Sequence, residues 1–207
     1  MHLNDVVLSV SPTGLGIMAA GWLGAAAGVG WSLRRLDYER IPAVGVMSAV
    51  FFAVSAVQIP LGPVAVHLVL NGLMGLLLGA AAFPAIMIAL LLQWLFFGEG
   101  GITTLGINTV NMAVPALVVY QLFGGVRSSR PTAVWWSGFG AGFVSILLSA
   151  AMTGLCIFAV GRNLQGLSIL VWITDGGLAL GEGLVTAAAV AFLHQVRPEV
   201  LRPVPAS

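Results

Sequence analysis

Residues 41–98 decide the fold class, and they read IPAVGVMSAVFFAVSAVQIPLGPVAVHLVLNGLMGLLLGAAAFPAIMIALLLQWLFFG. This stretch contains no Asp, Glu, Lys or Arg, whereas about 20 consecutive apolar residues already suffice for one helix to cross a bilayer. The chain of 207 residues is 59% hydrophobic and 7% charged, with a mean hydropathy of +1.04. A soluble domain carries about 25% charged residues. The sequence therefore predicts an all-α membrane protein with several spans and excludes a soluble enzyme.

Charge-free runs and the helix-breaking residues between them predict a bundle of seven transmembrane helices. The spans are expected at residues 12–33, 43–59, 64–82, 83–97, 109–124, 133–160 and 174–196. Seven spans of about 20 residues occupy most of the chain. Residues 1–207 are therefore expected to form a single transmembrane domain.

The arginines predict the orientation, since the chain has no lysine. With seven spans, only Arg162 falls on one side of the membrane. The other side carries Arg34, Arg35, Arg40, Arg127, Arg130, Arg197 and Arg202. Positively charged loops are typical of the cytoplasmic side, so we expect the N-terminus outside and the C-terminus in the cytoplasm. A net charge of +1 without a basic tract also predicts no nucleic-acid partner.

Two nitrogen-rich features fall on the predicted outer side. Met1 and His2 offer an amine nitrogen, an amide nitrogen and an imidazole that can form fused chelate rings around one ion. His67, expected near the outer start of the third span, could supply a fourth nitrogen. A near-planar nitrogen set suits Ni(II), Cu(II) or Co(II), whereas Mg(II) and Ca(II) prefer oxygen. Taken singly, His2 is also compatible with an arbitrary second residue, and His67 with a structural histidine.

A loop rich in glycine and threonine is expected between the fourth and fifth spans, also outside. Its composition is compatible with an ordinary connection or with a lid that covers a metal pocket. The candidate lid residues are Gly100, Gly101, Thr103, Thr104, Asn108 and Asn111.

Two carboxylates are expected in the seventh span. Asp175 and Glu182 are seven residues apart, which places them on one helix face, about 10 Å apart. A carboxylate at the bilayer centre costs roughly 2.5–3.5 kcal/mol, so both are expected to face inward. Asp175 fits a helix cap at the outer end or an ion path. Glu182 fits an ion path or a structural hydrogen bond to another helix, for example through Asn71.

Four segments together resemble the CbiM/NikM proteins, the substrate-binding membrane (S) components of energy-coupling-factor transporters for cobalt and nickel. These segments are Met1 with His2, residues 66–68 with Asn71 and Gly72, residues 100–108, and residues 181–186. The resemblance covers nearly the whole chain. One departure is Val6, which stands where the family has a glycine.

The resemblance implies that Ni(II) or Co(II) is bound, as a transported substrate, by the terminal amine of Met1, the backbone nitrogen and imidazole of His2, and the imidazole of His67. The glycine–threonine loop would occlude this site. The implied partners are a T-component membrane protein, two ABC ATPase subunits and, in many such systems, a small additional membrane subunit. The implied location is the inner (plasma) membrane of a prokaryotic cell. Such a chain is not an enzyme, and the sequence has no Walker A motif.

Two other classes of function stay open on the sequence alone. A stand-alone cation channel or secondary carrier could use Asp175 and Glu182 to pass protons or cations. An intramembrane hydrolase would need a serine beside His67. The available serines are Ser55, Ser145 and Ser149, none of which lies in a Gly-x-Ser-x-Gly motif.

Overall fold

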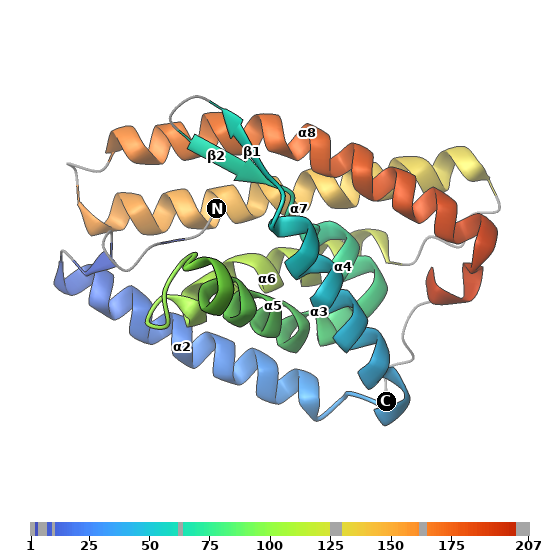
Figure 1. Cartoon of the computed structure of the whole chain (residues 1–207), viewed down its shortest axis with the longest axis horizontal. Coiled ribbons are helices and arrows are strands. Elements are labelled where there is room, and N and C mark those ends of the chain that lie inside the picture. The colour runs from blue at the N-terminus through green and yellow to red at the C-terminus, as the bar shows by residue number, and fades with distance from the viewer. Residues whose placement is uncertain are drawn as a thin grey trace.

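A computed structural model describes residues 3, 8–9, 11–61, 64–124, 130–161 and 165–201. This part of the chain is nearly all helical (Figure 1). Its helices are α2 (Pro12–Leu33), α3 (Ile41–Ser55), α4 (Asn71–Leu78), α5 (Ala82–Phe97), α6 (Leu105–Phe123), α7 (Pro131–Val160) and α8 (Gln165–Val196). Short 3₁₀ turns occur at η1 (Tyr38–Arg40), η2 (Gly79–Ala81) and η4 (Pro198–Leu201). Two short strands, β1 (Gln58–Leu61) and β2 (Val64–His67), interrupt the helices.

Among the described residues, 5 helical segments are long and apolar enough to cross a membrane. They are Pro12–Leu33, Asn71–Phe97, Leu105–Phe123, Pro131–Val160 and Val171–Val196. Helix α3 has 15 residues, about 22 Å of helix, which is shorter than the roughly 30 Å of a bilayer's hydrocarbon core. Several apolar helices of these lengths are the structure of a multi-pass membrane protein.

Local chemistry explains where two of these helices begin. The Ser11 side chain accepts the N–H of Gly14 at 3.1 Å, and Pro12 occupies the first turn of α2. The predicted first span is therefore confirmed at both ends. Pro131 opens α7 in the same manner. Helices α6 and α8 both begin earlier than the spans predicted at 109 and 174.

The structure corrects the prediction for the chain between α3 and α4. Strands β1 and β2 pair as an antiparallel hairpin in which Gln58 lies opposite His67. The predicted span 64–82 is therefore wrong at its start, and the predicted span 43–59 ends too late. His67 is the last residue of a strand and does not belong to a membrane helix.

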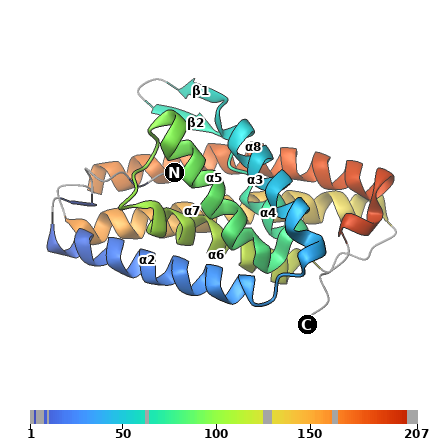
Figure 2. The same cartoon turned by 60° about the horizontal axis from the view of Figure 1, so that its bottom comes forward.

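Two prolines explain this departure from the predicted helices. Pro60 and Pro63 have no backbone N–H and cannot continue a helix. Valine at alternating positions of β2 favours an extended backbone instead. In Figure 2 the resulting hairpin stands at the edge of the helical bundle, near α8 and the C-terminal end of α5.

The chain reverses direction between α4 and α5. Helix α4 begins shortly after His67, and α5 ends shortly before Glu99. Because the side chains of these two residues approach to 3.8 Å, that start and that end lie at the same end of the bundle. The reversal occurs at Gly79, where φ is 56° and ψ is −124°, a conformation that glycine adopts far more readily than other residues. The apolar segment Asn71–Phe97 is therefore two helices that run in opposite directions.

Helices α7 and α8 form the long antiparallel pair of the bundle (Figure 1). Their backbones approach closely at glycines of α7. A Cβ on Gly142 would lie 2.5 Å from the carbonyl oxygen of Glu182, and one on Gly138 would lie 2.9 Å from the Cα of Ala187. Small residues at such spacing let membrane helices pack tightly. This packing fixes the part of α8 that carries Glu182.

Candidate metal centre

The backbone carbonyl of the next residue, Leu68, favours one tautomer of the His67 imidazole. Nδ1 lies 3.1 Å from the carbonyl oxygen of Leu68. Because a carbonyl oxygen can only accept, Nδ1 carries the hydrogen and Nε2 carries the lone pair. Burial lowers the pKa of His67 below its usual value, and the contact with Leu68 offsets part of that effect. The neutral imidazole with its lone pair on Nε2 is a form that binds metal ions.

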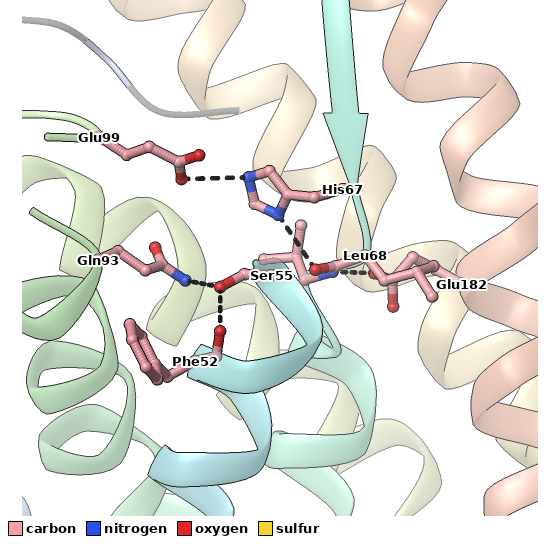
Figure 3. A network of polar contacts seen from close by, with 8 residues as sticks. Phe52, Ser55, His67, Leu68, Gln93, Glu99 and Glu182 are labelled. Atoms are coloured by element: carbon pink, nitrogen blue, oxygen red, sulfur yellow. Dashed lines mark hydrogen bonds and ion pairs between the residues drawn. The ribbon is translucent and has the colours of Figure 1, made fainter. Parts of the chain in front are cut away.

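Glu99 faces this Nε2 atom from the connection between α5 and α6. The distance from Nε2 to Oε2 of Glu99 is 3.8 Å, and Figure 3 shows the ring between Glu99 and the Leu68 carbonyl. No sequence pattern predicts a role for Glu99. The signal that could have found it is its position between Gly98 and Gly100, directly before the predicted lid residues.

The hairpin and the connection after α5 are tied together by contacts between α3 and α5 (Figure 3). Gln93 donates a side-chain hydrogen bond to the hydroxyl of Ser55, which donates in turn to the carbonyl of Phe52 at 2.8 Å. The rings of Phe52 and Phe97 stack with centroids 5.1 Å apart and planes 7° apart. Helix α3 leads into the hairpin, and α5 leads into the connection. These contacts therefore fix the two sides of the site relative to each other.

Glu182 holds the linker between β2 and α4. Its side chain is fully buried on α8. The carboxylate accepts the N–H of Val69 and also that of Leu70, which lies 3.0 Å from each carboxylate oxygen. The structure thus corrects the expected bond through Asn71, whose amide donates to the hydroxyl of Ser149 at 3.0 Å. Glu182 bonds to backbone that begins two residues after His67.

Asn108 lies on α6 and binds the backbone of Leu3. Its Oδ1 accepts the N–H of Leu3 at 2.8 Å, and its Nδ2 donates to the carbonyl of Leu3 at 3.0 Å. Leu3 is itself only 2% exposed. This reciprocal pair resembles the contact between two strands and fixes the backbone immediately after His2. Met1 and His2 lie outside the described residues.

The predicted lid is shorter than expected. Gly100, Gly101, Thr103 and Thr104 lie in the connection, whereas Asn108 and Asn111 are helical residues of α6. The helix extends further because Gly106 packs against α2, where a Cβ on Gly106 would lie 2.6 Å from the backbone nitrogen of Trp22. Asn111 does not cover the hairpin, because its amide donates to Thr153 of α7 at 3.3 Å.

Hydrogen bonds hold the connection between α5 and α6 in place. The hydroxyl of Thr104 donates to the carbonyl of Gly101 at 3.2 Å. The indole N–H of Trp22, on α2, donates to the carbonyl of Thr103 at 3.1 Å. The part of the connection that follows Glu99, at Thr103, is therefore attached to α2.

Asp175 is not a helix cap. It lies inside α8, which begins at Gln165, and its side chain is buried. One carboxylate oxygen, Oδ2, has no hydrogen-bond partner among the described residues. Asp175 and Glu182 share one helix, but only Glu182 bonds to the linker that follows His67.

Of the three predicted metal ligands, the structure describes His67. Within the described ranges, no group of three or more His, Cys, Asp or Glu side chains could hold a metal ion. A complete set of ligands at His67 would therefore need atoms other than these described side chains.

Comparison with known proteins agrees with this fold. Residues 2–200 match the CbiM family, described as a cobalt uptake substrate-specific transmembrane region. A chain of Haemophilus influenzae whose name describes metal transport is 34% identical and covers 97% of each sequence. The fused nickel transport protein NikMN of Rhodobacter capsulatus is 35% identical across 83% of this chain and 57% of its own length. The crystal structure of a truncated transition metal transporter superimposes with a TM-score of 0.69 at 23% identity, over 95% of this chain and 99% of that chain.

The fold and these matches define a multi-pass membrane protein of the metal-transport class. This chain belongs to the CbiM family. The resemblance to CbiM/NikM proteins that four sequence segments indicated is confirmed.

Proposed function

We propose that this chain is the S component of an energy-coupling-factor ABC importer and captures Ni(II) or Co(II) with high affinity. The proposed ligands are the terminal amine of Met1, the backbone nitrogen and imidazole of His2, and Nε2 of His67. The metal is the transported substrate, and the chain carries out no chemical reaction on it. A T component, two ABC ATPase subunits and a small additional membrane subunit would supply the energy for release into the cytoplasm.

The observation that carries this proposal is the pair of hydrogen bonds between the Asn108 side chain and the Leu3 backbone, which we call the Asn108–Leu3 clamp. Both hydrogen-bonding groups of the Leu3 backbone are satisfied by one buried side chain. His2 directly precedes Leu3 in the sequence. A flexible N-terminus would lose much conformational entropy on closing a chelate around an ion, and this clamp reduces that loss.

The orientation, with seven spans and the N-terminus outside the inner membrane, is part of the same proposal. The opposite directions of α4 and α5 support a chain path in which successive helices alternate in direction from α2 to α8. Arg40, at the start of α3, donates to the carbonyl of Leu77 near the end of α4 at 3.1 Å, which supports a common end for these two termini. Alternating helices then bring Arg34, Arg130 and Arg197 to that same end. Such clustering of arginine is typical of the cytoplasmic side.

The alternative functions receive less support from the site. In a carrier or channel, Glu182 would need carboxylate oxygens available to a passing ion, but both oxygens accept backbone N–H groups. In a hydrolase, a serine would need to donate to a histidine. Each candidate serine instead donates its hydroxyl hydrogen to a backbone carbonyl, as Ser55, Ser145 and Ser149 show.

Calorimetry on the purified chain with its native N-terminus tests the proposal. The wild-type chain should bind one equivalent of Ni(II) or Co(II), and His2→Ala and His67→Ala should both abolish that binding. His194→Ala is the matched control, because His194 lies in the last turn of α8, far from the ligands in sequence, and it should bind as the wild type does. Unchanged affinity in His2→Ala or His67→Ala would contradict the proposed site. Transport in proteoliposomes without ATPase partners would instead favour a carrier.

A further inference from the structure

We propose that Glu99 is an outer-sphere carboxylate of the metal centre, which attracts and retains the divalent cation at His67 without bonding to it. The inference rests on the proposed metal-capture function and adds a residue to it. It concerns specificity for charge, since a carboxylate beside the site favours a dication over neutral or singly charged ligands.

His67 presents the lone pair of its imidazole toward Glu99. Nδ1 donates to the Leu68 carbonyl, so Nε2 is the nitrogen that carries the lone pair in the proposed ligand set. That same nitrogen faces Oε2 of Glu99 at 3.8 Å (Figure 3). This separation is longer than a hydrogen bond. A cation bound to Nε2 would therefore lie within a few ångströms of the carboxylate. The four nitrogens of the proposed set complete a planar site, which leaves the carboxylate outside the ligand set.

The proposed ligands do not balance the charge of a divalent ion. The amine and the two imidazoles bind as neutral ligands, and the backbone nitrogen of His2 supplies at most one negative charge. A divalent cation held by this set keeps a net positive charge. Glu182 bonds to the backbone of the linker after His67, whereas the carboxylate of Glu99 faces Nε2 of His67 itself. The carboxylate of Glu99 supplies the missing negative charge.

The backbone on each side of Glu99 directs its side chain toward His67. The flanking residues Gly98 and Gly100 have φ values of 70° and 76°, in the left-handed region that favours glycine. They let the chain turn sharply on each side of Glu99. The bond between Gln93 and Ser55 ties the end of α5 to the end of α3. The backbone that carries Glu99 is therefore fixed relative to α3 and to the hairpin that follows it.

The side chains of His67 and Glu99 are both largely buried. The side chain of Glu99 is 17% exposed, and that of His67 is 9% exposed. Charges in partly buried positions are screened much less than charges in water. The carboxylate can therefore act on a cation at His67 over several ångströms.

The test compares Glu99→Gln with Glu39→Gln, an exposed acid in η1 that serves as the matched control. Three quantities are measured on the full chain with Ni(II): the Kd by calorimetry, the association rate at several NaCl concentrations, and the ligand-field absorption spectrum of the bound ion. We expect Glu99→Gln to raise the Kd by roughly 10–100-fold and to make association less sensitive to salt. The spectrum and the thermal unfolding temperature should stay as in the wild type. Glu99→Asp, which keeps the charge, should recover most of the affinity.

Two results would overturn this inference while the proposed function stands. One is an unchanged Kd in Glu99→Gln, which means that the carboxylate has no part in binding. The other is a changed ligand-field spectrum, which means that Glu99 bonds directly to the ion. Failure of the wild type and of Glu39→Gln to bind Ni(II) at all would instead overturn the proposed function itself.

Discussion

The carboxylate of Glu182, on α8, accepts the backbone N–H of Leu70, the residue that precedes α4, at 3.0 Å. Leu70 has a φ of 56°. No other non-glycine residue in the described part of the chain has a positive φ. A buried carboxylate at the N-terminal end of a helix is favoured by the helix dipole. This single contact connects α8 to the short linker that follows His67.

Replacing Glu182 with Gln should destabilise the protein and weaken metal binding together. The amide keeps the shape of the side chain but loses the charge and one acceptor oxygen. Hydrogen bonds to charged groups contribute about 1.5–3 kcal/mol each, so we expect the free energy of unfolding to fall by about 1–3 kcal/mol. Unfolding in detergent and Ni(II) calorimetry measure the two effects. The control is Glu199→Gln, an exposed partner of Arg197, which should change stability by less than about 0.5 kcal/mol. Equal stability of the two variants would show that Glu182 does not anchor the linker.

Asn108→Asp should weaken Ni(II) binding although it removes no proposed ligand atom. The carboxylate can still accept the N–H of Leu3, but it can no longer donate to the Leu3 carbonyl and repels it instead. Loss of a supporting contact around a metal site commonly lowers affinity about 10–100-fold, and we expect a Kd change in that range by calorimetry. The neighbouring change Thr109→Ser is the control, because the Thr109 hydroxyl bonds the Leu105 carbonyl of the same helix. Wild-type affinity in Asn108→Asp would argue that residue 3 need not be fixed for binding.

Replacing Gly142 of α7 or Gly181 of α8 with alanine should change the stability of the protein in different ways. Gly142→Ala would place a Cβ 2.5 Å from the backbone of α8, so the helices must separate, at a cost of typically 1–3 kcal/mol. Gly181→Ala meets nothing within 4 Å and should be neutral or stabilising by up to about 1 kcal/mol, since alanine favours helix. Thermal unfolding of the two variants measures the difference. A similar unfolding temperature in both would contradict the close packing of α7 on α8.

Much of the fold could be predicted from the sequence because hydrophobic runs and prolines act locally. The first span begins at Pro12 both in the prediction and in the structure, since Ser11 and Pro12 form a helix start without help from other elements. The hairpin around Pro60 was missed because its apolar residues resemble a membrane helix in composition. The early start of α6 was missed for a different reason, since it depends on Gly106 packing against α2, a contact distant in sequence.

The candidate site could be predicted only in part. An ionisable side chain is rare in an apolar segment, and this rarity indicates His67 as a candidate ligand from the sequence alone. Glu99 was missed because its importance depends on the hairpin, which brings His67 to the end of α5. The partners of Glu182 were missed because they are backbone N–H groups, which no side-chain pattern reveals. Asn108 was expected in a lid, and its hydrogen bonds to Leu3 become visible only when residue 3 is placed in three dimensions.

The central claim is that the free N-terminal amine of Met1 takes part in metal capture, and one measurement tests it directly. Calorimetry with Ni(II) and Co(II) should compare the chain that begins at Met1 with the same chain extended by three glycines before Met1, because a single added residue would create a new chelate of amine, backbone nitrogens and a third-position imidazole. The extension converts the amine into an amide and moves His2 out of the second position, without altering any described residue. The account predicts tight binding of one ion by the native chain and no detectable binding by the extended chain. Equal affinity of the two chains would contradict it.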